Sequence, residues 1–151
     1  MSYQIPNLVK ILQLRDLSKV GLYRFTPTDD VKLKNIIVTM YIRGLLASDF
    51  QMKINVYLDS LGRRKLFESD VVSNFDIDRS GDFYCEQRFD FPAASNLLAL
   101  GHEFYVEFEL LGTYAFDEAN YLGLIIDHDS PLAILASGSN VIRHSAFYDI
   151  A

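Results

Sequence analysis

The segment from 83 to 111 constrains the fold of this chain more than any other feature. Apolar residues alternate with polar ones over 83–91 and again over 104–110. A period of two is typical of strands that have one buried and one solvated face. Between these strands, Pro92 and Gly101 bracket the stretch 93–100 in the order typical of a short helical turn. Two strands joined by such a crossover, and not by a tight hairpin, indicate a chain that passes from one sheet of a sandwich to the other.

The same alternation recurs along most of the chain. In the clearest example, 50–58, every residue at an even position is apolar. We count about eight such strands, separated by turns at intervals of about 8–12 residues, and this spacing predicts an all-β sandwich or barrel. A change of phase near Asn35 predicts a bulge or a bend within the run 31–43. One core is expected to hold the side chains of Phe50, Met52, Ile54, Val56, Phe89, Phe91, Phe104, Val106 and Phe108.

The first 18 residues do not alternate. They contain the apolar residues Leu8, Ile11, Leu12 and Leu14, which would form one stripe of a short helix or part of an extended arm. We therefore divide the chain into an N-terminal arm or short helix, 1–18, and a single β domain, 19–151. Exposed apolar patches usually mark contact sites, so Leu8, Ile11 and Leu12 are candidate partner-binding residues. Packing of the arm on its own domain is the alternative.

Composition limits the class of protein. Half of the 151 residues are apolar, which suffices for a substantial core and is too many for an intrinsically disordered chain. No apolar run approaches the roughly 20 residues of a membrane-spanning helix, and the N-terminus lacks the pattern of a signal peptide. A single cysteine, Cys85, permits no intrachain disulfide. We expect a chain that folds in a reducing cytosol and does not span a membrane.

The charge is acidic overall and unevenly distributed. The net charge of −6 argues against general nucleic-acid binding. Residues 1–65 carry a net charge of +6 and the remainder carries −12. The protein is either simply a well-solvated acidic one, or its surface has opposite poles suited to head-to-tail packing of several copies.

The residue pattern does not favour catalysis. The three histidines, His102, His128 and His144, lie on separate segments without the spacing of common metal motifs. Asp127 and Asp129 flank His128 at a strand end, where an ordinary polar turn explains them. Glu107 and Glu109 share the outer face of one strand, where we expect solvated carboxylates of ordinary acidity. The sequence therefore predicts a protein that is not an enzyme and has no required cofactor.

A short acidic run gives a possible calcium ligand set. Asp76, Asp78, Ser80 and Asp82 lie around Gly81 in a spacing that matches the first half of a calcium loop. The match then fails, because Gln87 stands where a bidentate glutamate is needed. The same residue types are also those that turns require. Calcium at this run remains one interpretation, and a plain turn is the other.

Three aromatic residues surround an acidic loop. Tyr114, Phe116 and Tyr121 lie beside Asp117 and Glu118. Exposed aromatic rings next to carboxylates suit a sugar platform or a protein-binding hot spot. The alternative is that these rings cover one end of the sandwich.

The succession of strands resembles the small jelly-roll modules of the carbohydrate-binding-module type, which also occur in bacteriophage virion structural proteins. The resemblance rests on 54–59 (INVYLD), on 89–110 (FDFPAASNLLALGHEFYVEFEL) and on 147–150 (FYDI). It implies a jelly-roll β-sandwich of about eight strands in two antiparallel sheets, and a tendency toward adhesion or assembly. Sugar-binding members commonly stack sugars on tryptophan, and this chain has none.

From the resemblance we expect a non-enzymatic structural or adhesion subunit of a phage-like virion, such as a capsid decoration, cement or tail-associated protein. Its partners would be other structural proteins of the particle and further copies of itself, with neither nucleic acid nor membrane. It would be assembled into the virion in the host cytoplasm. The alternative is a saccharide-binding module that recognises glycans through Tyr114 and Tyr121.

Overall fold

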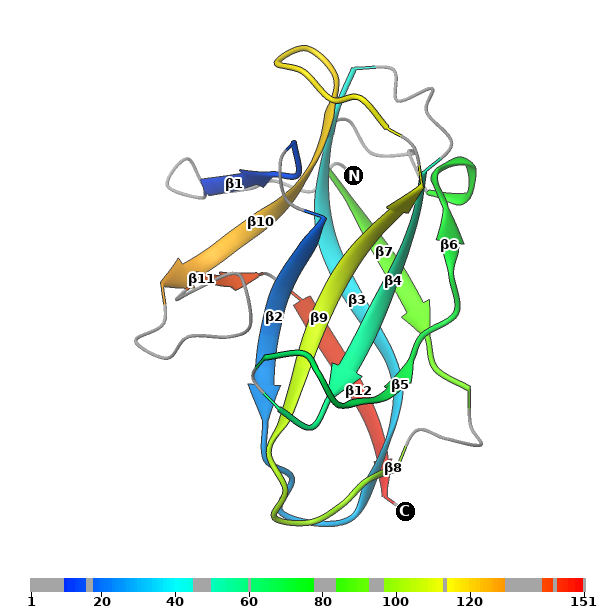
Figure 1. The fold of residues 1–151 in the computed structure, drawn as a ribbon, viewed down its shortest axis with the longest axis vertical. Coiled ribbons are helices and arrows are strands. Elements are labelled where there is room, and N and C mark those ends of the chain that lie inside the picture. Colours follow the sequence, from blue (N-terminus) through cyan, green and yellow to red (C-terminus); the bar gives the residue numbers. More distant parts are fainter. Residues whose placement is uncertain are drawn as a thin grey trace.

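Two antiparallel β-sheets, of seven and five strands, face each other in the computed structural model of this protein (Figure 1). The structure describes residues 10–15, 18–44, 50–59, 61–77, 84–92, 97–112, 114–129, 140–142 and 144–150. Within these ranges the helical structure is a single 3₁₀ turn, Asn74–Asp76, capped by the Ser73 hydroxyl. In the same ranges, no helix has the length and apolar character needed to cross a membrane.

The seven-stranded sheet is organised around one long central strand, β3 (Val31–Arg43). One edge of β3 pairs with β10 over residues 40–43 and with β12 over 31–38, and the other edge pairs with β7 and β8. β10 also pairs with β1 and β11. The strands around β3 are β1 (Lys10–Gln13), β7 (Tyr84–Asp90), β8 (Leu97–Leu98), β10 (Tyr121–Asp129), β11 (Asn140–Ile142) and β12 (His144–Ile150).

The five-stranded sheet forms the front layer of Figure 1 and completes a jelly roll. Its strands are β2 (Lys19–Phe25), β4 (Phe50–Tyr57), β5 (Lys65–Glu68), β6 (Val72–Ser73) and β9 (Phe104–Gly112). Eight strands in the orders β1-β10-β3-β7 and β2-β9-β4-β5 have the arrangement of two interlocked Greek keys. This confirms the predicted jelly-roll sandwich of about eight strands. β6, β8, β11 and β12 are additions to that frame.

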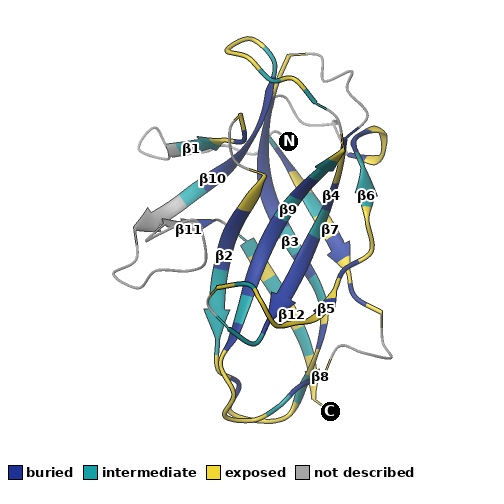
Figure 2. Cartoon of the chain, in the orientation of Figure 1, coloured by how far each residue is buried: buried dark blue, intermediate teal, exposed yellow. Residues whose placement is uncertain are grey.

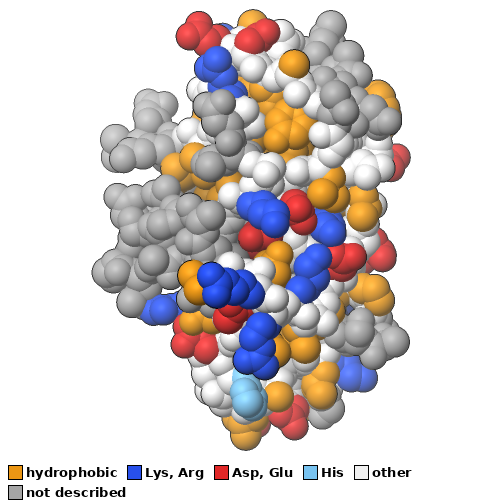
Figure 3. Space-filling model, viewed as in Figure 1, with side chains coloured by type: hydrophobic (Ala, Val, Ile, Leu, Met, Phe, Trp, Pro, Cys, Tyr) orange, Lys and Arg blue, Asp and Glu red, His pale blue; other side chains and the backbone are white. Residues whose placement is uncertain are grey.

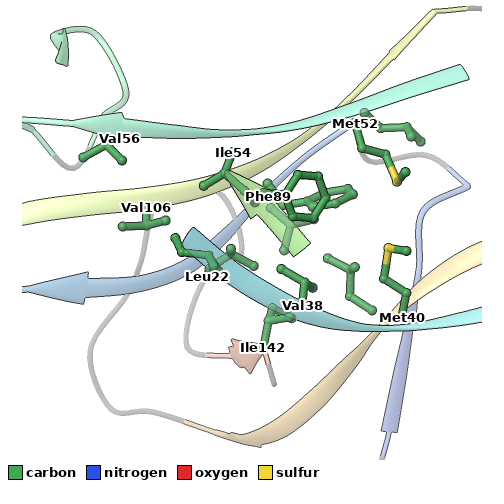
Figure 4. Packing of buried hydrophobic residues seen from close by; sticks show 14 of the residues in the cluster. Leu22, Val38, Met40, Met52, Ile54, Val56, Phe89, Val106 and Ile142 are labelled. Carbon is green, nitrogen blue, oxygen red and sulfur yellow. The ribbon is translucent and has the colours of Figure 1, made fainter. Parts of the chain in front are cut away.

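The core lies between the two sheets, as Figure 2 shows. All nine side chains predicted to share it belong to one buried cluster. Figure 4 shows how the two sheets meet, with Met52, Ile54 and Val106 from one sheet facing Val38, Met40 and Phe89 from the other. The rings of Phe89 and Phe108 pack edge to face across the layers, with centroids 6.0 Å apart. The phase of alternation therefore identified the buried face of each strand correctly.

The predicted crossover follows the expected path, and its predicted helix is contradicted at Leu97 and Leu98. The chain leaves β7 in one sheet and enters β9 in the other, as expected. Within the predicted helical turn, however, Leu97 and Leu98 form β8 and pair with Lys32 and Val31. Residues 93–96 lie outside the described ranges. A helix of two turns gains little by itself, whereas β8 adds strand hydrogen bonds and buries Leu98 in the core.

The bulge predicted near Asn35 is confirmed. The register between β12 and β3 shifts between Phe147 and Tyr148, which lie opposite Asn35 and Leu33. The extra residue, Lys34, belongs to β3, so β3 bends while β12 stays regular.

The N-terminal segment is not helical where the structure describes it. Residues 10–13 form β1, which pairs with β10, and Leu14 is fully buried in the core. A side-chain carbon on Gly123 would lie 2.6 Å from the Ile11 Cγ2 atom, so glycine there allows β1 to lie close to β10. Of the two predicted forms, helix and extended arm, residues 10–13 therefore take the extended one, because pairing with β10 satisfies the backbone and places Leu14 between the sheets. Leu8 lies outside the described residues.

Replacement of Phe104 by alanine is expected to lower the free energy of unfolding by about 3–5 kcal/mol, because a fully buried ring is lost and a cavity remains. Urea denaturation measures the difference. Leu61→Ala is the matched control, since Leu61 is 70% exposed and a surface change should cost less than about 0.5 kcal/mol. Equal effects of the two substitutions would contradict the core assignment.

Candidate functional site

A groove with an apolar floor lies at one end of the sandwich. Its volume is about 700 Å³. It lies where the ends of β4 and β5 approach β8 and the start of β9. Its apolar lining is Leu58, Leu66, Leu97, Ala99 and Phe104, and its polar lining is Arg64, His102, Glu103 and Tyr105.

Leucines that face solvent gather at this groove. Leu66 is 40% exposed and Leu97 is 49% exposed, although each belongs to a strand. Leu100, which follows the lining residue Ala99 but does not itself line the groove, is 55% exposed. At the rim, Glu103 forms an ion pair of 3.4 Å with Arg24. The Tyr105 hydroxyl bonds to Glu103, and this bond and burial raise the pKa of the phenol. An apolar centre inside a polar rim has the composition of a protein-binding surface.

One wall of the groove is a loop that is held by Asp59. The Asp59 carboxylate accepts hydrogen bonds from the backbone N–H groups of Arg63 and Arg64 at 3.0 and 2.8 Å. The Arg64 carbonyl in turn accepts from the Leu58 N–H at 2.9 Å. Gly62 takes a φ of +67°, which glycine adopts without strain. These bonds hold the backbone at Arg64, which lines the groove.

Under the same loop lies a polar cluster on the outer face of the five-stranded sheet. Asn55 donates hydrogen bonds to the carboxylates of Glu107 and Glu109 at 3.0 and 2.9 Å. The Tyr57 hydroxyl donates to Glu107 at 3.0 Å. Burial and the neighbouring carboxylate raise the pKa of Tyr57 well above its usual value. Figure 3 shows this face, where positive and negative side chains alternate across the middle.

The expectation that Glu107 is solvated is wrong. Glu107 is only 5% exposed, because the loop that follows β4 folds over it. A side-chain carbon added to Gly62 would lie 3.9 Å from a Glu107 carboxylate oxygen and 3.7 Å from the Tyr57 ring. Strand alternation predicted the face of the sheet that carries Glu107, but it contained no information about a loop that covers this face.

Lysines complete the cluster. Lys53 donates to Glu68 at 2.7 Å, and Lys65 donates to the same oxygen at 2.9 Å. These hydrogen bonds lower the pKa of Glu68 and raise that of Lys53. Lys53 also lies 3.7 Å from Glu109. The alternating charges link β4, β5 and β9 on the face that the loop covers.

A ladder of aromatic rings closes the opposite side of the sandwich, between β2 and β12. Tyr23 stacks on His144 with centroids 4.4 Å apart, and Phe25 stacks on Tyr148 at 4.8 Å. The Tyr23 and Tyr148 hydroxyls lie 2.8 Å apart in a hydrogen bond. Burial raises the pKa of both phenols. The Tyr148 hydroxyl raises the pKa of Tyr23 further, whereas the hydrogen bond with Tyr23 partly offsets the rise at Tyr148. The ladder thus requires neutral tyrosines.

Phe116 links the three loop aromatics, because its ring lies 4.7 Å from that of Tyr114 and it also packs against the cluster that contains Tyr121. Tyr114 and Phe116 are half-buried and pack edge to face on Phe50, with centroids 6.5 and 5.5 Å away. Tyr121 begins β10, is 6% exposed, and packs with Tyr41 and Ile125 on the outer face of the seven-stranded sheet. Ile11 packs against this second cluster, whereas Leu12 packs on the main core. The arrangement is that of rings covering one end of a sandwich.

The remaining predicted residues do not converge on a described site. Asp76 ends the 3₁₀ turn and lines a hollow of about 610 Å³ that also contains Asp70, Glu86 and Asp90. Asp78, Ser80 and Asp82 lie outside the described residues, so calcium binding stays a prediction. His128 and Asp129 continue β10 where a turn was expected, because they pair with β11. In the described ranges, no three His, Cys, Asp or Glu side chains are grouped so as to hold a metal ion.

Sequence comparison identifies no relative of this chain. The chain matches no protein-family model and no curated protein sequence. The groove residues Arg64, Leu66, Leu97 and His102 were not predicted as a site. One available signal was the leucine at 66 within the mostly polar stretch 63–69.

Strongly alkaline pH is expected to destabilise the protein through Tyr23 and Tyr148. The fold holds both phenols neutral, whereas unfolded tyrosine ionises near pH 10. The two tyrosines therefore make their full contribution to the free energy of unfolding below about pH 10, and this contribution is lost as the pH rises above that value. Urea denaturation between pH 8 and pH 11 should show the loss, and Tyr23→Phe/Tyr148→Phe should reduce the slope above pH 10. An identical slope in the double variant would contradict this assignment.

Calcium at millimolar concentration is expected to raise the melting temperature if Asp76, Asp78, Ser80 and Asp82 hold an ion, because a ligand that binds only the folded state stabilises it. Asp78→Ala should abolish the rise, while Asp117→Ala, outside the run, should not. A melting temperature that calcium leaves unchanged would assign the run to an ordinary turn.

Proposed function

We propose that this protein is a non-enzymatic structural or adhesion subunit of a phage-like virion that acts through protein–protein contacts. It would serve as a capsid decoration, cement or tail-associated protein, assembled in the host cytoplasm. The virion context rests on the resemblance to jelly-roll modules of such particles. The groove between β5 and β8 is the contact surface that we assign to the partner.

The groove is the observation that carries the proposal. Leu66 and Leu97 remain about half exposed there, although the fold buries most other strand leucines. Burial of apolar surface is the main source of free energy in protein association, and a partner that covers these leucines removes them from water. Arg64 and His102 at the rim would orient a partner with acidic or hydrogen-bond-accepting groups.

The alternative function, glycan recognition through Tyr114 and Tyr121, is less well supported. A sugar platform needs an exposed ring face, and Tyr121 is 6% exposed. A glycan array tests the alternative directly. Specific binding that Tyr114→Ala abolishes would favour it over the structural role.

Reconstitution tests the groove. Particles encoded by the neighbouring genes would be produced without this chain, and the purified chain would then be added back and sedimented with them. Wild-type protein should sediment with the particles, and Leu66→Asp should reduce the bound fraction at least about tenfold, because a buried unpaired carboxylate opposes docking. Leu61→Asp is the control, since Leu61 is exposed and does not line the groove. Wild-type protein that fails to bind the particles, or equal binding of both variants, would contradict the proposal.

A further inference from the structure

The seven-residue strand β12 has one hydrogen-bonding edge that no described strand occupies. β12 pairs with β3 along its whole length, and within the described ranges this is its only pairing. Figure 1 shows β12 (red) in the rear layer, where it runs to the C-terminal end of the described chain. β10 pairs with β3 over residues 40–43 on the same edge, and it pairs with β11 and not with β12. An open edge of this kind is a template for another strand.

The other edge strands carry features that discourage such pairing. β1 and β5 have four residues each, and β5 places Lys65 and Glu68 on its short length. In β2, the pairing with β9 shifts between Gly21 and Tyr23, which distorts the strand. β7 presents Glu86, Arg88 and Asp90 along one face. Short length, charge and bulges are the devices by which natural sheets protect their edges.

β12 lacks those devices. It contains no lysine, arginine or proline, and the bulge opposite it belongs to β3. Its outer face carries Ser145, Phe147 and Asp149, and Phe147 is 48% exposed. Asp149, the acidic residue of the strand, already lies 3.6 Å from Lys34 of β3. Beyond it, Ile150 is 86% exposed. The edge is therefore long and regular, and it exposes the apolar side chains of Phe147 and Ile150.

We propose that β12 pairs antiparallel with β12 of a second copy of this chain, so that the seven-stranded sheets of two sandwiches become continuous. We choose a second copy of this chain as the partner because the sequence of β12 is complementary to itself. In an antiparallel pair related by a twofold axis, residues that face each other must point to the same side of the sheet. This condition allows only registers that are centred on a residue.

The register centred on Phe147 is the favourable one. It places the two Phe147 rings side by side across the axis and sets Ser145 opposite Asp149 of the second copy, where a hydroxyl can donate to a carboxylate. Cross-strand aromatic pairs and hydroxyl contacts of this kind stabilise sheets. The register centred on Asp149 would oppose two carboxylates, and the one centred on Tyr148 would place Phe147 against Asp149. Charge and apolar character thus select one alignment.

Disulfide trapping tests the alignment. In the favoured register the two copies of residue 147 face each other, so Phe147→Cys should form a covalent dimer under mild oxidation. Ser145→Cys is the control, because its two copies would lie roughly 13 Å apart along the strands, beyond disulfide range. The double variant Ser145→Cys/Asp149→Cys should crosslink again. Wild-type protein, whose only cysteine is the buried Cys85, should not.

Sedimentation at increasing protein concentration tests association without a crosslink. Wild-type protein should form a reversible dimer, and Ser145→Asp should raise the dissociation constant by at least about tenfold, because it places a carboxylate opposite Asp149. Ser145→Lys should lower it. Since Ser145 is exposed, both variants should keep the wild-type melting temperature at a protein concentration where the wild type is monomeric. A wild-type protein that stays monomeric at high concentration, or trapping through Ser145→Cys alone, would overturn the proposal. This outcome is independent of whether the groove binds a particle.

Discussion

The architecture depends on the backbone pairing of β3. This thirteen-residue strand pairs with β10 and β12 on one edge and with β7 and β8 on the other. No single neighbour is long enough to cover β3, so its edges are shared by segments that lie far apart in the chain. The bulge at Lys34 bends β3 near its start, where β8 and the end of β12 pair with it. The position of the groove and the open edge of β12 both follow from this sharing.

The gap between the sheets and the outer face of the five-stranded sheet are covered by different kinds of interaction. Between β2 and β12, stacked rings and the hydrogen bond of Tyr23 with Tyr148 fill the gap between the sheets. On the outer face of the five-stranded sheet, a loop covers a cluster of carboxylates and lysines. Buried carboxylates are stable only when they are hydrogen-bonded, and Asn55 and Tyr57 supply those bonds to Glu107. The loop that covers Glu107 also positions Arg64, so the polar cluster and the groove form one structural unit.

Sequence patterns predicted local features and failed where distant segments compete. The alternation at 50–58 and 104–110 predicted which side chains are buried, because a strand with one buried face must alternate. The phase change at Asn35 predicted a bulge for the same reason. The predicted helix over 93–100 failed at Leu97 and Leu98, since pairing with β3 is a contact between residues more than 60 positions apart. The sequence likewise left helix and extended arm open for 10–13, because the partner strand β10 is more than 100 residues away.

The sequence by itself determined the all-β class, the inward face of each clear strand and the passage of the chain from β7 to β9, because each depends on periodicity within one segment. Only the tertiary structure decided that β1 belongs to the sheet, that Glu107 is buried and that Tyr121 faces other tyrosines. It also decided which leucines remain exposed, since Leu66 and Leu97 lie on different sheets and meet only when the sandwich closes. A side chain stays exposed when no other residue packs on it in the fold, and the linear sequence does not specify which residues will lie around it.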